Sequence, residues 1–79
     1  MLDWDDLRFF LAVARHRTMA EAARTLGVAQ PTVGRRIAAF ERKLGASLFV
    51  RFGTGWAVSP AGQSMLANAQ AMEAQALVS

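Results

Sequence analysis

The stretch that decides the fold is TMAEAARTLGVAQPTVGRRIAAFERKL, residues 18–44. Thr18 and Glu21 have the spacing of a capping box, in which a threonine hydroxyl accepts a backbone hydrogen bond at the start of a helix. Gly27 readily takes the left-handed conformation that ends such a helix. Pro31 has no backbone N–H and therefore fits the first turn of a second helix. The stretch predicts two helices joined by a tight turn.

The second of these helices has two faces of different chemistry. Its apolar residues form one narrow stripe at helical spacing: Val33, Ile37, Phe40 and Leu44. The opposite side carries small and basic residues: Pro31, Arg35, Ala38 and Arg42, flanked by Thr32 and Gly34. Such a face is typical of a helix-turn-helix whose second helix reads the edges of bases. A helical hairpin with a solvated basic face is the alternative, and the turn alone does not decide between them.

Composition and charge narrow the class of protein. The chain has 79 residues, no cysteine and a net charge of +3, so we expect one small domain without a disulfide or a cysteine metal site. All nine basic residues lie between Arg8 and Arg51 against only two acidic ones, which makes that segment +7. This concentration favours a polyanion partner over a merely solvated basic face.

Other classes of function find little support. His16, Asp5 and Asp6 are explained by the ends of a first helix over residues 3–16, so we expect no catalytic site, no metal site and no cofactor. Residues 52–72 carry no charge, but glycine, proline and amide residues interrupt them, which argues against a membrane span. Without a basic and apolar leader after Met1, a cytoplasmic protein is expected.

The segment SLFVRFGTGWAV, residues 47–58, is the first without helical periodicity. Its β-forming residues on either side of a Gly-Thr-Gly turn predict a short hairpin, the wing of a winged helix-turn-helix. Arg51 is the only charge on this wing and is expected to contact phosphate or the minor groove. We expect Phe49 to pack in the core, whereas the sequence leaves Trp56 undecided.

Ser59 and Pro60 open a last helix, since a capping serine precedes a proline at the first position. A seam of apolar and small residues runs along this helix without a stop signal, so the chain looks like part of a longer one. A homodimer contact is the functional interpretation of the seam, and packing against the chain's own domain is the alternative. The predicted dimer residues are Met65, Leu66, Ala69, Met72 and Ala76.

Three motifs together resemble the N-terminal DNA-binding domain of LysR-type transcriptional regulators. They are LRFFLAVA, AEAARTLGVAQPTVGRRIAAFERKLGASLFVR, and the SPAG that opens the last helix. The likeness covers nearly the whole chain and divides it into a winged helix-turn-helix at residues 1–58 and a linker helix at 59–79. Molybdenum-responsive regulators, which have a similar domain, are the nearest competing family.

The resemblance implies binding to inverted-repeat operators in double-stranded DNA by homodimers or tetramers joined through the linker helix. A small-molecule effector would act only through a C-terminal domain that these residues do not include. By position, the residues facing bases would be Gln30, Pro31, Thr32, Gly34 and Arg35. Those at phosphates or on the wing would be Thr18, Arg36 and Arg51.

Three departures from the family pattern bear on DNA recognition. Ala29 replaces the usual capping serine of the recognition helix, Gly34 replaces a common serine, and Thr54 replaces an arginine that is frequent at the wing tip. We expect the class of function to survive and the operator preference to shift. A protein-interaction module and a nonspecific architectural protein remain alternatives; basic residues on the outward face argue against the first.

Overall fold

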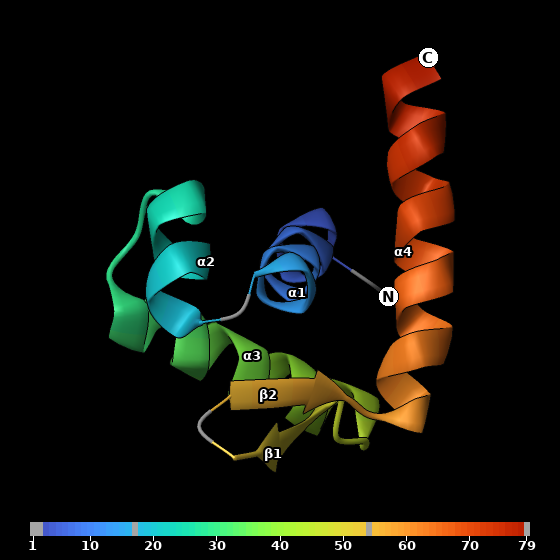
Figure 1. Ribbon diagram of the computed structural model, residues 1–79. Coiled ribbons are helices and arrows are strands. Elements are labelled where there is room, and N and C mark those ends of the chain that lie inside the picture. The colour runs from blue at the N-terminus through green and yellow to red at the C-terminus, as the bar shows by residue number, and fades with distance from the viewer. Residues whose placement is uncertain (1–2, 17, 54, 79) are drawn as a thin grey trace.

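The computed structural model describes residues 3–16, 18–53 and 55–78 of the chain. The described elements are α1 (Trp4–Arg15), α2 (Met19–Leu26), α3 (Gln30–Leu44), β1 (Phe49–Phe52), β2 (Gly55–Val58) and α4 (Pro60–Val78). In Figure 1, α1 to α3 form a helical head, the hairpin lies at the base of the molecule, and α4 stands to one side. This is the mainly helical winged helix-turn-helix that the sequence predicts.

Local signals set the helix boundaries as expected. The Asp3 side chain accepts a hydrogen bond from the Asp5 N–H, and the Thr18 hydroxyl accepts one from the Glu21 N–H at 3.1 Å. Gly27 ends α2 in the left-handed region with φ of 72°. Ala29 precedes α3 without any side-chain hydrogen bond, so the missing cap predicted for this helix is confirmed.

The core is built around α1. Its residues Leu7 and Phe10 are fully buried, and the Phe10 ring meets the Phe40 ring of α3 edge-on with 6.5 Å between centroids. Phe49 at the start of β1 packs against the Phe10 ring, with 5.3 Å between the ring centroids. Phe49 is buried, which confirms the core position expected for it. One aromatic cluster therefore joins α1, α3 and the wing.

Ser59 ties the base of the hairpin to the start of α4. Its N–H donates to the Leu48 carbonyl at 2.9 Å, its hydroxyl donates to the Ser47 carbonyl at 2.6 Å, and the same hydroxyl accepts from the Gly62 N–H at 2.9 Å. A Cβ added at Gly62 would collide with the Leu48 carbonyl oxygen and with the Val58 side chain. The direction in which α4 leaves the wing is thus set by close backbone packing.

Part of the predicted dimer seam on α4 is used within the chain. Ala69 is fully buried, and Met65 and Leu66 pack against the same core, because this face of α4 lies on the head. The assignment of Ala69 to a dimer surface is therefore corrected. Met72 is exposed, whereas the side chain of Ala76 lies outside the described residues.

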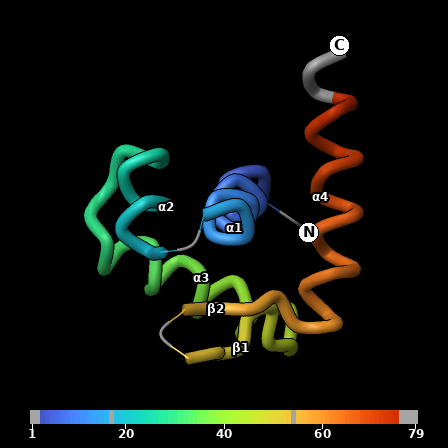
Figure 2. The backbone as a smooth tube through the Cα atoms, viewed as in Figure 1, coloured from blue at the N-terminus to red at the C-terminus, as the bar shows by residue number. Residues whose placement is uncertain are grey.

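The far part of α4 extends beyond the other helices (Figure 2). Near this end, the Arg15 guanidinium of α1 donates two hydrogen bonds to the Glu73 carboxylate, at 2.6 and 3.1 Å. None of the helices described is long and apolar enough to cross a membrane.

Candidate nucleic-acid interface

The start of α3 presents the predicted base-facing residues to solvent. Gln30, Pro31 and Arg35 are exposed, and Thr32 and Gly34 are half-buried beside them. The helix turns this face outward because its apolar stripe is buried in the core: Val33, Ile37 and Phe40. All five predicted residues therefore gather on one accessible surface, which we call the α3 face.

Arg35 is the only cation among these five residues and is held only weakly. Its Nη2 lies 3.4 Å from the Thr32 hydroxyl, a long hydrogen bond along one turn of the helix. A Cβ added at Gly34 would meet nothing within 4 Å, so the backbone surface beside Arg35 is open. An exposed guanidinium next to an open backbone leaves space for a ligand on this side of α3.

Two cations of α3 point instead toward α1. The Asp6 carboxylate, almost buried, lies 2.7 Å from the Lys43 ammonium and 3.5 Å from the Arg36 guanidinium. The Arg36 guanidinium also sits over the Phe9 ring at 4.6 Å. These contacts join the two helices and neutralise part of the positive charge that the sequence concentrates here.

The remaining arginines that the structure describes divide into two groups. Arg8 is paired with Asp5, and Arg15 with Glu73. Within residues 3–16, 18–53 and 55–78, no carboxylate lies at ion-pair distance from the others: Arg24, Arg35, Arg42 and Arg51. Because charges already paired inside the fold attract a polyanion less, these four arginines carry most of the available positive charge.

On the wing, Arg51 and Trp56 face each other as a cross-strand pair, with the guanidinium 5.1 Å from the ring centroid. This stacking holds the one charge of the wing in an extended position. Trp56, undecided from the sequence, is 39% exposed and acts as a platform for Arg51 rather than as core. Thr54 lies outside the described residues.

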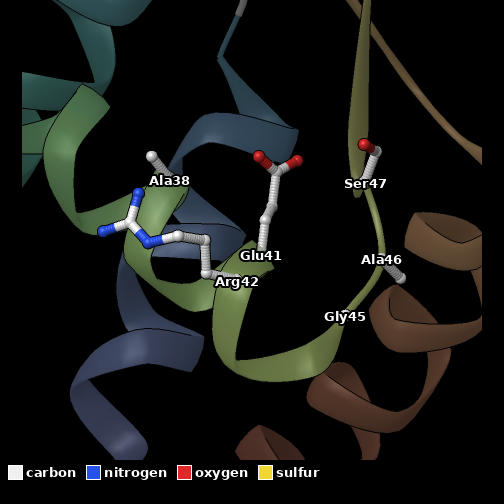
Figure 3. A pocket seen from close by; sticks show the side chains of 6 residues that line it. All are labelled: Ala38, Glu41, Arg42, Gly45, Ala46 and Ser47. Carbon is white, nitrogen blue, oxygen red and sulfur yellow. The ribbon is translucent and has the colours of Figure 1, made fainter.

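Glu41 connects the recognition helix to the wing. Its Oε2 accepts hydrogen bonds from the backbone N–H of Leu48, at 2.7 Å, and of Phe49, at 3.3 Å. Figure 3 shows this carboxylate between α3 and the segment that leads to β1. Glu41 lines an open hollow of about 470 Å³. Arg42 lines the same hollow.

Two predicted phosphate contacts have roles inside the fold. Thr18 caps α2, and Arg36 is engaged by Asp6 and Phe9. Their contacts with phosphate stay predictions. Sequence reasoning missed the positioning roles of Asp6 and Glu41. The only signal for Glu41 was its place within the motif AEAARTLGVAQPTVGRRIAAFERKLGASLFVR, and Asp6 was interpreted as a charge at a helix start.

The chain matches known proteins of one family. Residues 4–63 match the family model of the lysR family of bacterial regulatory helix-turn-helix proteins. The HTH-type transcriptional regulator TfdS of Cupriavidus pinatubonensis is 39% identical over 90% of this chain and 24% of its own length. BudR of Klebsiella aerogenes, another HTH-type transcriptional regulator, is 38% identical over 80% of this chain and 44% of its own. The chain thus spans less than half the length of these relatives.

Solved structures of similar shape include DNA complexes. The DNA-binding domain of CbnR in complex with DNA has a TM-score of 0.86 and 35% identity, covering 95% of this chain and 86% of that one. The BenM DNA-binding domain on benA site 1 DNA has a TM-score of 0.89 and 28% identity, covering 95% and 84%. The chain belongs to the lysR family of bacterial regulatory proteins and forms its winged helix-turn-helix DNA-binding domain.

Proposed function

We propose that the chain binds a specific operator as a homodimer, with the start of α3 in the major groove and the wing at the adjacent minor groove. The observation that carries the proposal is the exposed α3 face, on which Arg35 has no acidic partner among the described residues. The similar domains of CbnR and BenM have been solved in complex with DNA, which supports DNA binding by this chain.

Each residue of the α3 face has a chemical role in this proposal. Arg35 pairs bidentately with a guanine, while Gln30 and Thr32 hydrogen-bond to neighbouring base edges. Pro31 and Gly34 are small enough for close approach of the helix. Arg51 contacts phosphate or sugar from the wing, and backbone contacts are assigned to Thr18 and Arg36.

The quaternary arrangement is proposed from α4. Its Met72 is exposed on a helix that is otherwise anchored to the head, and it offers an apolar contact to a second copy. The longer protein would form dimers or tetramers, sense a small molecule through a C-terminal domain, and work in the cytoplasm without catalytic activity or a cofactor. The names of TfdS and BudR as transcriptional regulators support a role in transcription.

The test begins with selection of a binding site from a randomised duplex library, followed by fluorescence-anisotropy titrations at several salt concentrations. The selected duplex is compared with its scrambled counterpart. We expect tighter binding to the selected duplex, a steep salt dependence and two chains per site. No binding to either duplex at low salt would contradict DNA binding and favour a protein-interaction module; equal binding to both would indicate a nonspecific architectural protein.

Arg35→Ala tests the base-reading role. It should weaken binding to the selected duplex by about 1–3 kcal/mol and relax the preference at one base pair. Arg8→Ala is the matched control, because it removes the same charge from an α1 residue already paired with Asp5. An equal loss on both duplexes would make Arg35 a phosphate contact instead.

A further inference from the structure

The outward face of the wing is apolar and uncovered. Phe52 is 77% exposed and Val50 is 46% exposed, and both side chains lie on the same face of β1 because residues two apart in a strand point the same way. Their cross-strand partners are Gly55 and Ala57, which are too small to cover them. The opposite face carries Phe49 in the core and the stacked pair of Arg51 and Trp56.

Phe52 adds little to the stability of the fold, since most of its ring remains in water. It is the last residue of β1 and directly precedes Gly53, whose φ of 63° turns the chain at the tip of the wing. Adjacent exposed apolar side chains, such as Phe52 and Val50, form the kind of patch that can mark a contact surface. The question is which partner covers this ring.

We propose that Phe52 is a minor-groove contact whose ring acts as an apolar wedge at a base step beneath the wing. The inference rests on the proposed DNA binding of this chain and adds a recognition residue to it. Adjacent residues of a strand point to opposite faces, so the Phe52 ring can enter the groove while the neighbouring Arg51 guanidinium reaches a phosphate at its edge.

Charge and position favour DNA over a protein partner. Residues 47–58 contain one arginine and no acidic residue, so nothing on the wing repels phosphate. The base of the wing is held to α3 by Glu41, which places Phe52 on a hairpin fixed to the proposed reading helix. Phe52 therefore lies on the same hairpin as Arg51, next to it in the chain and on the opposite face of the strand.

If the Phe52 ring acts as a wedge, the chain should prefer certain base steps at a position of the duplex that α3 does not contact. Pyrimidine–purine steps unstack at low cost, whereas A-tracts are stiff. The selected duplex should therefore carry a TA or CA step beneath the wing. Replacing this step with a stiffer one should weaken DNA binding by the wild-type chain. It should have little effect on DNA binding by a chain without the phenyl ring.

The experiment compares the wild type with Phe52→Ala and Phe52→Leu on the library-selected duplex, by anisotropy and by energy transfer between dyes at the duplex ends. Phe52→Ala should weaken binding roughly tenfold, the size expected for burial of one exposed phenyl ring, and should reduce the DNA bend. Phe52→Leu should keep much of the binding affinity and much of the DNA bend. Val50→Thr, on the same face but further from the tip, is the control and should bind nearly as the wild type does.

Thermal unfolding of each variant guards against a folding defect, and Phe52→Ala should melt close to the wild type because its ring is exposed. A wild type that binds specifically while Phe52→Ala matches it in affinity, step preference and bend would overturn this inference and leave the proposed function intact. Loss of self-association in sedimentation with unchanged DNA affinity would also overturn it, because the ring would then meet a second copy. A wild type without any sequence preference would overturn both.

Discussion

The carboxylate of Glu41 in α3 accepts a hydrogen bond from the backbone N–H of Leu48, 2.7 Å away, at the base of the wing. The same oxygen accepts from the next N–H, that of Phe49. Arg35 lies earlier on the same helix, and Arg51 lies further along the same hairpin. This side chain thus helps to fix the two elements that we propose to contact DNA relative to each other, which a two-groove contact requires.

Glu41→Ala should remove both of these hydrogen bonds and leave two partly buried N–H groups without their acceptor. Hydrogen bonds to a charged group contribute about 1.5–3 kcal/mol, so we expect a loss of free energy of unfolding in that range. Glu41→Gln keeps an oxygen acceptor and should lose less. Urea unfolding monitored by circular dichroism measures both, and equal stability of all three chains would contradict the positioning role.

Ala29→Ser should stabilise the chain. Ala29 precedes α3 with extended backbone angles and no side-chain hydrogen bond, so the first N–H groups of the helix lack a side-chain cap. A serine hydroxyl at this position typically contributes about 1 kcal/mol. The melting temperature should rise, and Ala29→Gly, which restores no hydroxyl, should give a much smaller change. A serine variant that melts at or below the wild-type temperature would show that the absent cap does not cost the chain stability.

The fold could be predicted because its signals are local. Thr18, Gly27 and Ser59 act on backbone groups within a few residues, and the apolar stripe of α3 needs only the helical period to be seen. The pairing of β1 with β2 is equally local, since the two strands follow each other closely in the chain. Each of these elements formed where its residues indicated, since nothing distant competes with them.

The pairing of charges could not be predicted in this way. Asp6 and Lys43 are far apart in sequence, and only the packing of α1 on α3 brings them together. From the sequence alone, Lys43 and Arg36 are therefore counted as free positive charges. Ala69 shows the same difficulty, because a stripe of small residues fits a second copy or the chain's own α1 equally well, and only the folded position of α4 decides.

Gly34→Ala separates helix stability from DNA recognition. A glycine inside a helix costs up to about 1 kcal/mol relative to alanine, and the added Cβ would meet no atom within 4 Å, so the variant should be more stable. If the bare backbone of Gly34 serves close approach to bases, the same variant should bind the selected duplex more weakly. Gly34→Ser should behave alike, and unchanged affinity and preference in both would contradict the close-approach role.

The ion pair between Arg15 and Glu73 should make the attachment of α4 dependent on pH. The Arg15 guanidinium, hydrogen-bonded to the carboxylate, lowers the pKa of Glu73 and raises its own. Because the folded-state pKa of Glu73 is depressed, its stabilising contribution is present above the unfolded pKa of about 4.3 and is lost as the pH falls through the folded-state value. Glu73→Gln removes this contribution at every pH.

The wild type should therefore be more stable than Glu73→Gln at pH 7, and the difference should close as the pH falls below about 4. Added salt should also narrow this difference in stability, since both side chains are partly exposed and salt screens their attraction. The exchanged pair Arg15→Glu with Glu73→Arg is the matched control and should recover part of the stability at pH 7. Urea unfolding at several pH values measures the difference, and a constant gap between the two chains from pH 7 to pH 3 would show that the ion pair does not anchor α4.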